Sequence, residues 1–246
     1  MKALIVCVDF SDFLSVTLPY NRHHFEKVQI VTTLEDRQTQ EIALLNNCDL
    51  HLTSAFYADG ANFNKYKAVE DALDTLGREG WICLMDADVL WPKVLPELGT
   101  RPSDLMTPKR RMLLDLSLLS LEKHLLDEKT WKELPLHPGT EFAGYTQIFH
   151  ASCPFLGPAP WHETNWRHAG GADSFFQAKW PEERKIRPPF EVLHLGPAGE
   201  NWCGRSTPYL DGSTPESSEE RKNLLKRYVE SRLGKQGADR FRHEKI

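Results

Sequence analysis

Short apolar runs separated by longer amphipathic segments make up the first part of the chain. Residues 3–8 and 81–85 are continuous apolar runs, and residues 28–32 are rich in β-branched side chains. A strand that is apolar on both faces is typical of a parallel sheet covered by helices on both sides. We therefore expect three buried strands here, with a shorter alternating strand over residues 49–54.

Helical patterns separate these strands. An apolar face recurs at helical spacing within residues 64–77, and it comprises Tyr66, Val69, Leu73 and Leu76. Gly77 is suited to end this helix, and an earlier helix is expected to start near Asp36. The alternation predicts an α/β domain of Rossmann-like type, with a central, mostly parallel sheet flanked by helices.

The pattern changes in the second half of the chain. Residues 111–134 are Leu-rich with helical spacing, and residues 136–144 contain prolines and glycines typical of a loop. After them we expect strands at 145–150 and 190–195, an irregular stretch at 154–171 and a short helix at 173–180. The predicted organisation is one domain over residues 1–214, and a helical tail over residues 215–246 that packs on it or extends from it.

Composition narrows the class of protein. A chain of 246 residues with 40% hydrophobic side chains can bury a full core. Its five cysteines are scattered without a C-x-x-C pair, which argues against a disulfide framework and favours a reducing compartment. The first apolar run is too short for a signal peptide, and no run of about 18 apolar residues could span a membrane. We therefore expect a cytoplasmic protein without a transmembrane segment.

Polar side chains follow the predicted strands at their carboxyl ends. Because the ligand crevice of an open α/β sheet lies outside these ends, Asp9, Thr33, Asp86 and Asp88 are expected along one rim. In an extended segment, residues two apart project to the same side, so Asp86 and Asp88 can present two hard oxygen ligands to a divalent cation. The alternative is that Asp88 caps a helix beginning near Pro92 and that Asp86 is a solvated turn residue.

The segment Leu84-Met85-Asp86-Ala87-Asp88 after a hydrophobic strand resembles the D-x-D signature of GT-A fold, nucleotide-sugar-dependent glycosyltransferases. The resemblance implies a GT-A domain in which Asp86 and Asp88 hold the metal ion. The later His194-Leu195-Gly196 resembles the segment whose histidine completes the metal shell, which implies His194 as a third ligand. Outside that context, His194 on an apolar strand is an ordinary core histidine.

Two other segments agree in order with the family. Residues 64–68, Asn64-Lys65-Tyr66-Lys67-Ala68, resemble the segment that contacts the nucleotide and diphosphate, which implies donor contacts by Asn64, Lys65 and Lys67. Residues 171–176 resemble the acidic segment that supplies the general base, which implies Asp173 as the catalytic residue. Asp173 is alternatively an ordinary helix N-cap. The chain departs from the family's common pattern at Thr32-Thr33, where an Asp-rich turn is usual, and at Ala172-Asp173, where Glu-Asp is usual.

These residues predict a mechanism based on charge. A cation held by Asp88 would offset the negative charge of a leaving diphosphate, helped by Lys65 or Lys67 and by Arg205 from a loop over residues 201–205. Mixed carboxylate and imidazole ligands favour Mn²⁺ over Mg²⁺. An ionised Asp173 would accept the proton of the acceptor hydroxyl, and the resemblance implies that the transfer inverts the anomeric carbon.

The donor is expected to be a UDP-sugar that also contacts Asp9, Thr33 and Asp86. The acceptor stays open between a saccharide, another hydroxyl and a hydroxymethylated DNA base, the last suggested by Lys109-Arg110-Arg111 and a cationic tail. Trp161, Trp166 and Trp202 could stack on the sugar or base, or could anchor loops.

Two other classes compete with this hypothesis. One is a nucleotidyltransferase of similar fold, although the turn at residues 9–13 lacks the glycines of a phosphate-binding loop. The other is a non-catalytic carbohydrate-binding module.

Overall fold

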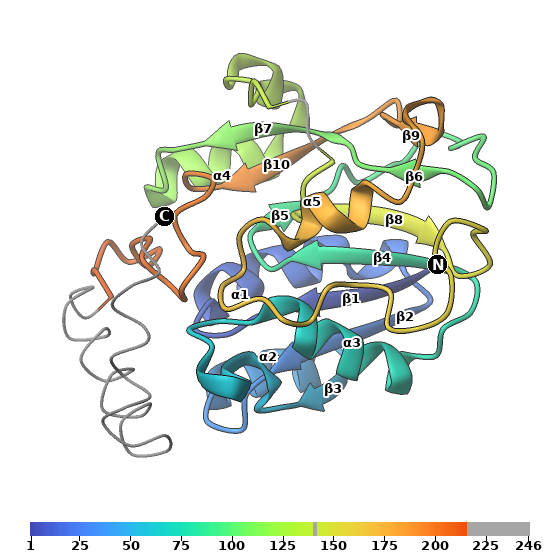
Figure 1. Ribbon diagram of the computed structural model, residues 1–246. Helices are drawn as coiled ribbons and strands as arrows, with labels where there is room; N and C mark the ends of the chain where they lie inside the picture. The colour runs from blue at the N-terminus through green and yellow to red at the C-terminus, as the bar shows by residue number, and fades with distance from the viewer. Residues whose placement is uncertain (140–141, 216–246) are drawn as a thin grey trace.

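The computed structural model describes residues 1–139 and 142–215, which form two β-sheets with helices around them (Figure 1). The larger sheet has seven strands in the order β3-β2-β1-β4-β8-β6-β9. Its first four strands run parallel to one another: β1 (Lys2–Val6), β2 (Lys27–Thr32), β3 (Asp49–Leu52) and β4 (Trp81–Asp86). The predicted α/β class with a mostly parallel central sheet is confirmed.

The direction of the sheet changes at its fifth strand. Strand β8 (Thr146–His150) runs antiparallel to β4 and to the short β6 (Leu105–Met106), and β6 pairs in parallel with β9 (Lys185–Ile186). Strand β8 therefore starts at the edge of the sheet where β4 ends, beside the pair Met85 and Thr146.

Side-chain alternation along β1 explains why both faces of the sheet are covered. Ala3 and Ile5 pack in one apolar cluster with residues of α1 (Ser11–Asn21) and α2 (Arg37–Leu45). Leu4 and Val6 point to the opposite face and pack in a second cluster. That second cluster contains the apolar face of α3 (Lys65–Leu76), whose residues Tyr66, Val69, Leu73 and Leu76 are all buried, as their spacing predicts.

A second sheet of three strands, in the order β5-β10-β7, forms the upper part of the molecule in Figure 1. Strand β10 (Glu191–Leu195) pairs in parallel with β7 (Lys109–Leu113) and antiparallel with β5 (Val89–Leu90). Because β5 immediately follows Asp88, this pairing brings residues near 90 beside residues near 194.

The structure corrects two expectations. Residues 91–104 contain no helix, so the interpretation of Asp88 as the cap of a helix near Pro92 is wrong. The Leu-rich segment at 111–134 begins as strand β7, because these residues pair with β10. Only later does it become α4 (Leu118–Leu126) and the 3₁₀-helix η3 (Glu128–Glu133).

Short helices complete the described chain. Helix α5 (Ala172–Gln177) corresponds to the helix expected at 173–180. The 3₁₀-helices are η1 (Arg22–His24), η2 (Ala55–Gly60) and η4 (Glu182–Arg184). In the part of the chain that the structure describes, no helix is both long and apolar enough to cross a membrane. The predicted tail at 215–246 lies, except for its first residue, outside the described residues, so its helical character stays a prediction.

Candidate active site

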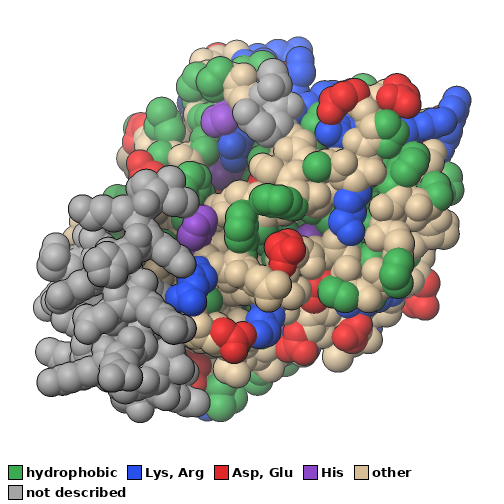
Figure 2. Space-filling view, viewed as in Figure 1, with side chains coloured by type: hydrophobic (Ala, Val, Ile, Leu, Met, Phe, Trp, Pro, Cys, Tyr) green, Lys and Arg blue, Asp and Glu red, His purple; other side chains and the backbone are tan. Residues whose placement is uncertain are grey.

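A cavity of about 490 Å³ opens beyond the carboxyl ends of β1 and β4. Five of the predicted site residues line it: Lys65, Asp86, Asp88, Asp173 and His194. They come from the start of α3, the end of β4, the turn before β5, the first turn of α5 and strand β10. The space-filling view shows side chains of both charge signs spread over the face drawn there (Figure 2).

Asp86 is held in place by an ion pair. Lys65, which is only 8% exposed, donates from Nζ to Asp86 Oδ1 and to the carbonyl of Gly144, the latter at 3.0 Å. The backbone N–H of Asp86 donates to the carbonyl of Tyr145 at 3.0 Å. One oxygen of Asp86 is therefore already occupied by a cation of the protein itself.

Asp88 has a different environment. Its side chain is 13% exposed, and Oδ1 is buried without a hydrogen-bond partner. Burial raises the pKa of the Asp88 carboxyl; His194 and Lys65 act against the rise, and the negative charge of Asp86 adds to it. A buried carboxylate without a partner is costly, so the fold holds this group where a cation would stabilise it.

His194 faces the same point. Its Nδ1 lies 3.2 Å from the carbonyl oxygen of Gly196, which can only accept, so the ring proton is assigned to Nδ1. Its Nε2 then carries a lone pair and lies 3.8 Å from Asp88 Oδ2. A backbone carbonyl that fixes the tautomer in this way is a common support for a metal-binding histidine.

The donor set therefore fits a divalent cation between Asp88 and His194. Among the described residues, no group of three or more His, Cys, Asp or Glu side chains is placed to hold a metal ion. The remaining ligands of a bound cation would have to come from a substrate and from water, as is usual for a metal ion that binds phosphate oxygens.

Asp173 is positioned by hydrogen bonds to backbone N–H groups. Its Oδ2 accepts from Gly144 at 2.7 Å and its Oδ1 accepts from Ser174 at 3.0 Å. The N-cap of α5 is Gly171, with φ of 90°, so the alternative interpretation of Asp173 as the N-cap is wrong. Asp173 lies in the first turn of the helix, with its carboxylate at the wall of the cavity.

Gly144 allows this arrangement. A Cβ at this position would overlap Tyr66 Oη and would lie 3.1 Å from Asp173 Cβ. Tyr66 is buried, and burial raises its pKa well above the usual value, an effect that the negative charges of Asp173 and Asp86 increase. Sequence reasoning assigned Tyr66 only to the core and Gly144 only to a loop, since the proximity of these two residues depends on the tertiary fold.

The other predicted donor-binding residues do not line this cavity. The backbone N–H of Asp9 donates to Asp36 Oδ2 at 2.8 Å, and Thr33 Oγ1 accepts from the N–H of Asp36 at 3.3 Å. Asn64 caps α3 by accepting from the N–H of Lys67 at 3.0 Å. The Lys67 ammonium pairs with Asp59 at 2.5 Å on the surface.

Arg205 is directed away from the cavity. Its buried guanidinium donates to both carboxylate oxygens of Asp12 and to the carbonyls of Asp9, Thr207 and Pro208. It also lies over the Tyr209 ring at 3.9 Å. These contacts fasten the segment after β10 to helix α1. A contact between Arg205 and a diphosphate stays a prediction for which this arrangement offers no support.

Of the three tryptophans singled out in the sequence, Trp161 lies apart, whereas Trp166 and Trp202 both stack with His168. Trp161 is buried against Phe149 in the core. Trp166 lies edge-on to Phe175. Trp202 is 53% exposed, lines the cavity and stacks with His168. Of the three, Trp202 is placed to contact a ligand.

Comparison with known proteins identifies the fold. No protein-family model and no curated protein sequence matches the chain. Among solved structures, GalNAc-T7 with UDP, GalNAc and Mn²⁺ superimposes with a TM-score of 0.53 at 15% identity, covering 93% of this chain and 47% of that one. This chain thus spans about half the length of GalNAc-T7.

Two further matches have lower TM-scores. Mannosyl-3-phosphoglycerate synthase from Rubrobacter xylanophilus has a TM-score of 0.47 at 9% identity, covering 100% of this chain and 76% of that one. Glucosyl-3-phosphoglycerate synthase from Mycobacterium tuberculosis, in complex with phosphoglyceric acid, has a TM-score of 0.37 at 10% identity, covering 63% and 57%. The superposition on GalNAc-T7 shows that this chain has the GT-A fold, as the D-x-D segment predicts.

Proposed function

We propose that this protein is a metal-dependent glycosyltransferase that moves a sugar from a UDP-sugar to an acceptor hydroxyl. The observation that carries the proposal is that Asp88 and His194 face each other. Asp88 Oδ1 has no hydrogen-bond partner and His194 Nε2 has a lone pair, so both could bind a cation. The same cavity contains Lys65 and Asp173. GalNAc-T7, which shares the fold, has been solved with UDP and Mn²⁺.

Asp88 and His194 would hold Mn²⁺ or Mg²⁺, which when bound would neutralise the negative charge that develops on the leaving diphosphate. Asp86 stays paired with Lys65, so it orients that lysine and is available to a cation through its other oxygen. The ammonium of Lys65, at the cavity wall, adds a further positive charge near the diphosphate.

Asp173 would act as the general base. Its carboxylate is fixed by the N–H groups of Gly144 and Ser174, which prevents it from rotating out of the cavity. Accepting the proton of the acceptor hydroxyl in this position makes the oxygen a better nucleophile for in-line attack on the anomeric carbon. Direct attack inverts the configuration at that carbon.

The alternative nucleotidyltransferase function finds less support. Helix α1 starts at Ser11, directly after the turn that follows β1, and its N-cap is Phe10, which makes no side-chain capping bond. A phosphate cradle built from glycine N–H groups would need a different turn at this position. We therefore assign the phosphate-binding role to the metal site.

Calorimetry with UDP tests the proposal. Binding should need Mn²⁺ or Mg²⁺ and should fall by at least tenfold in excess chelator. UDP-sugars incubated with protein and metal should also release UDP slowly, because water can replace the acceptor. Equal affinity for UDP with and without chelator would show that no cation bridges the diphosphate. Absence of any UDP release would instead favour a non-catalytic sugar-binding module.

A further inference from the structure

The loop after β10 contributes an exposed aromatic ring to the candidate active-site cavity. Trp202 lines the same cavity as Asp88 and Asp173, and 53% of it is exposed. Among the tryptophans of the described residues, it alone is exposed. Ligand pockets are typically lined by aromatic side chains with a few polar groups, so this position indicates a ligand contact that neither the metal nor the general base explains.

The backbone of Gly170 supports one face of the Trp202 ring. A Cβ at position 170 would lie 2.6 Å from Cδ2 and 2.9 Å from Cε2 of Trp202, the two atoms that both rings of the indole share. Any side chain at this position would therefore displace the indole. The N–H of Ala169 also donates to the carbonyl of Trp202 at 2.8 Å, and His168 stacks with the indole. Because more than half of Trp202 is exposed, the opposite face of the ring is left for a ligand.

The residue before Trp202 supplies an oriented polar group. Asn201 also lines the cavity, and its Oδ1 accepts the backbone N–H groups of Ser206 at 2.8 Å and Thr207 at 3.1 Å. Because two backbone donors identify the oxygen of this amide, its NH₂ group is the part that can donate to a ligand. A flat apolar face beside a hydrogen-bond donor suits a pyranose, which has C–H groups on its faces and hydroxyls at its edge.

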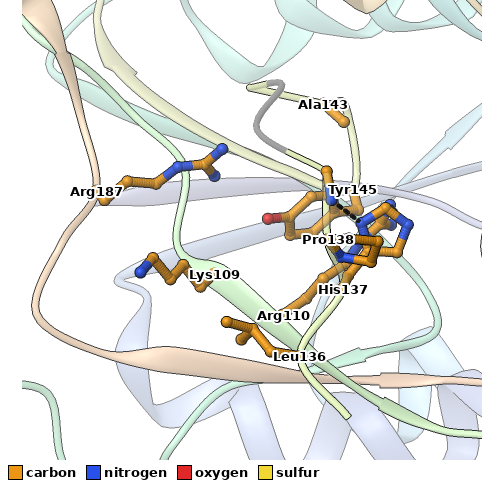
Figure 3. Close-up of a pocket in the computed structure, with 9 residues that line it drawn as sticks. Lys109, Arg110, Leu136, His137, Pro138, Ala143, Tyr145 and Arg187 are labelled. Carbon is orange, nitrogen blue, oxygen red and sulfur yellow. Dashed lines mark hydrogen bonds between the residues drawn. The ribbon is translucent and has the colours of Figure 1, made fainter.

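The charges that line the cavity favour a neutral acceptor. The described lining contains three carboxylates and two fully charged cations, namely Asp86, Asp88, Asp173, Lys65 and Arg110. Lys65 is paired with Asp86, and Arg110 lies over the Tyr145 ring, 4.2 Å from its centroid (Figure 3). Since the phosphates of a nucleic acid strand need an excess of cationic side chains, this lining suits an uncharged molecule better.

The support of Trp202 connects it to the proposed general base. Gly170 directly precedes Gly171, the N-cap of α5, and Asp173 lies in the first turn of that helix. The group that accepts the proton of the acceptor hydroxyl has to contact the acceptor. A molecule on the exposed face of Trp202 would therefore lie on the acceptor side of the cavity.

We propose that Trp202 is the platform of an acceptor subsite, and that the acceptor is a neutral saccharide whose pyranose ring stacks on the indole. This inference rests on the proposed glycosyl transfer. The amide of Asn201 would donate to a hydroxyl at the edge of the ring, and another hydroxyl of the same sugar would face Asp173. Of the acceptors that the sequence leaves open, these residues favour a saccharide over a hydroxymethylated DNA base.

The test titrates the methyl pyranosides of glucose, galactose and mannose, each separately, into the full chain saturated with UDP and Mn²⁺. At least one of them should bind, and Trp202→Ala should weaken that binding by on the order of tenfold, the loss of one stacking contact. Trp202→Phe keeps a smaller aromatic face and should retain the affinity within about threefold of wild type. The affinity for UDP should stay unchanged in both variants.

Two further variants sharpen the test. Gly170→Ala keeps the indole but displaces it, so it should weaken the pyranoside as Trp202→Ala does. The control is Phe175→Ala, which removes an exposed aromatic ring of α5 that does not line the cavity and should leave the affinity for the pyranoside unchanged.

The outcomes separate this inference from the proposed function. If UDP binds with its metal but no pyranoside does, or if Trp202→Ala binds the pyranoside as tightly as Phe175→Ala, the saccharide subsite is overturned and the transferase proposal stands. If Trp202→Ala instead weakens the binding of UDP or UDP-glucose, the ring serves the donor and the acceptor subsite is overturned. Binding of hydroxymethyldeoxycytidine that depends on Trp202, without binding of any pyranoside, would overturn the saccharide in favour of a modified base. If UDP does not bind even with metal, both proposals are overturned.

Discussion

Two neighbouring regions of the candidate active-site cavity differ in how their polar groups are hydrogen-bonded. In the first, which we call the paired region, Lys65 binds Asp86 and Gly144, and Gly144 in turn binds Asp173. In the second, the unpaired region, Asp88 and His194 face each other at 3.8 Å, and one Asp88 oxygen has no partner. Only one residue, Ala87, separates Asp86 from Asp88.

This difference indicates which part of the site the fold completes by itself. Buried polar groups in proteins are nearly always hydrogen-bonded, so a buried carboxylate oxygen without a partner needs an explanation, which the proposed cation would supply. The paired region carries its own cation in Lys65 and keeps Asp173 in place. In the proposed function, a cation from solution would complete the unpaired region. We expect substitutions in the two regions to differ in whether they affect binding, chemistry or stability.

Asp88→Asn should have the largest effect. Transfer should fall by on the order of 10²-fold or more, and UDP binding should lose its dependence on metal, because the amide is a poor ligand for a divalent cation. Stability should not decrease, since the substitution removes a charge whose burial raises the pKa of the carboxyl. Steady-state assays, calorimetry and thermal melts together check this.

The control for Asp88→Asn is Asp49→Asn on the exposed strand β3, which should behave as wild type in all three measurements. Normal metal-dependent binding in Asp88→Asn, or a marked loss of stability, would mean that the unpaired region has a structural role.

Asp173→Asn should separate chemistry from binding. An asparagine side-chain oxygen can still accept the N–H of Gly144, so the loop geometry should survive while the basicity is lost. Transfer should fall by about 10²-fold or more, with metal-dependent UDP affinity within a few-fold of wild type. Transfer close to the wild-type rate, with donor and metal saturating, would exclude Asp173 as the general base and remove the argument for inversion.

The sequence alone predicted the buried parallel strands, because continuous apolar runs are typical of them. It also placed Asp86 and Asp88 at the end of one such strand, on the edge of the sheet that the carboxyl ends of parallel strands share. It could not predict the pairing of β5 with β10, since β5 has two residues and its partner lies about a hundred residues later. That pairing is what places Asp88 beside His194.

Arg205 is a case in which the sequence suggested a role that a long-range contact does not support. Its residue type suggested a diphosphate ligand, but its guanidinium binds Asp12, 193 residues earlier in the chain. Likewise, the need for glycine at position 144, in the turn before β8, arises from Tyr66 in α3 and Asp173 in α5. Long-range contacts decide these roles, and a single sequence contains no periodic pattern that reports them.

Lys65→Met should lower both the stability of the fold and the affinity for UDP. Without Lys65, the half-buried Asp86 carboxylate loses its cation, at a cost of about 2 kcal/mol. UDP affinity should also fall by on the order of tenfold, since one positive charge near the diphosphate is lost. Thermal melts and calorimetry measure the two effects.

The matched control is Lys67→Met, two residues along the same helix, which breaks only the exposed pair with Asp59 and should change the melting temperature little. In a double-mutant cycle, Asp86→Asn should restore part of the stability lost in Lys65→Met. Additive effects would show that Lys65 and Asp86 do not form the stabilising pair that defines the paired region.

The smallest expected effect is on how the free energy of unfolding depends on pH, and it concerns the packing between α3 and α5. His162 is stacked between Tyr66 and Phe176, which joins α3 to α5, and its Nδ1 lies 2.6 Å from Glu70 Oε1. Burial lowers the pKa of His162, although Glu70 acts in the opposite direction. The unfolded chain therefore binds a proton at this residue near pH 6.5 that the folded chain does not, so stability is lost as pH falls below about 6.5.

His162→Gln removes this proton site and should flatten the fall of the free energy of unfolding between pH 7 and 5, measured with urea. Glu70, whose pKa is lowered from 4.5, contributes mainly below this window. The pKa of His24 is lowered to about 4, so His24 contributes within the window, but equally in both proteins, and its effect cancels in the difference. Equal slopes for wild type and His162→Gln would mean that His162 is already protonated in the fold, paired with Glu70 as a buried ion pair. The stack between α3 and α5 would then depend on charge rather than on a neutral ring, and the paired region would contain a second internal cation beside Lys65.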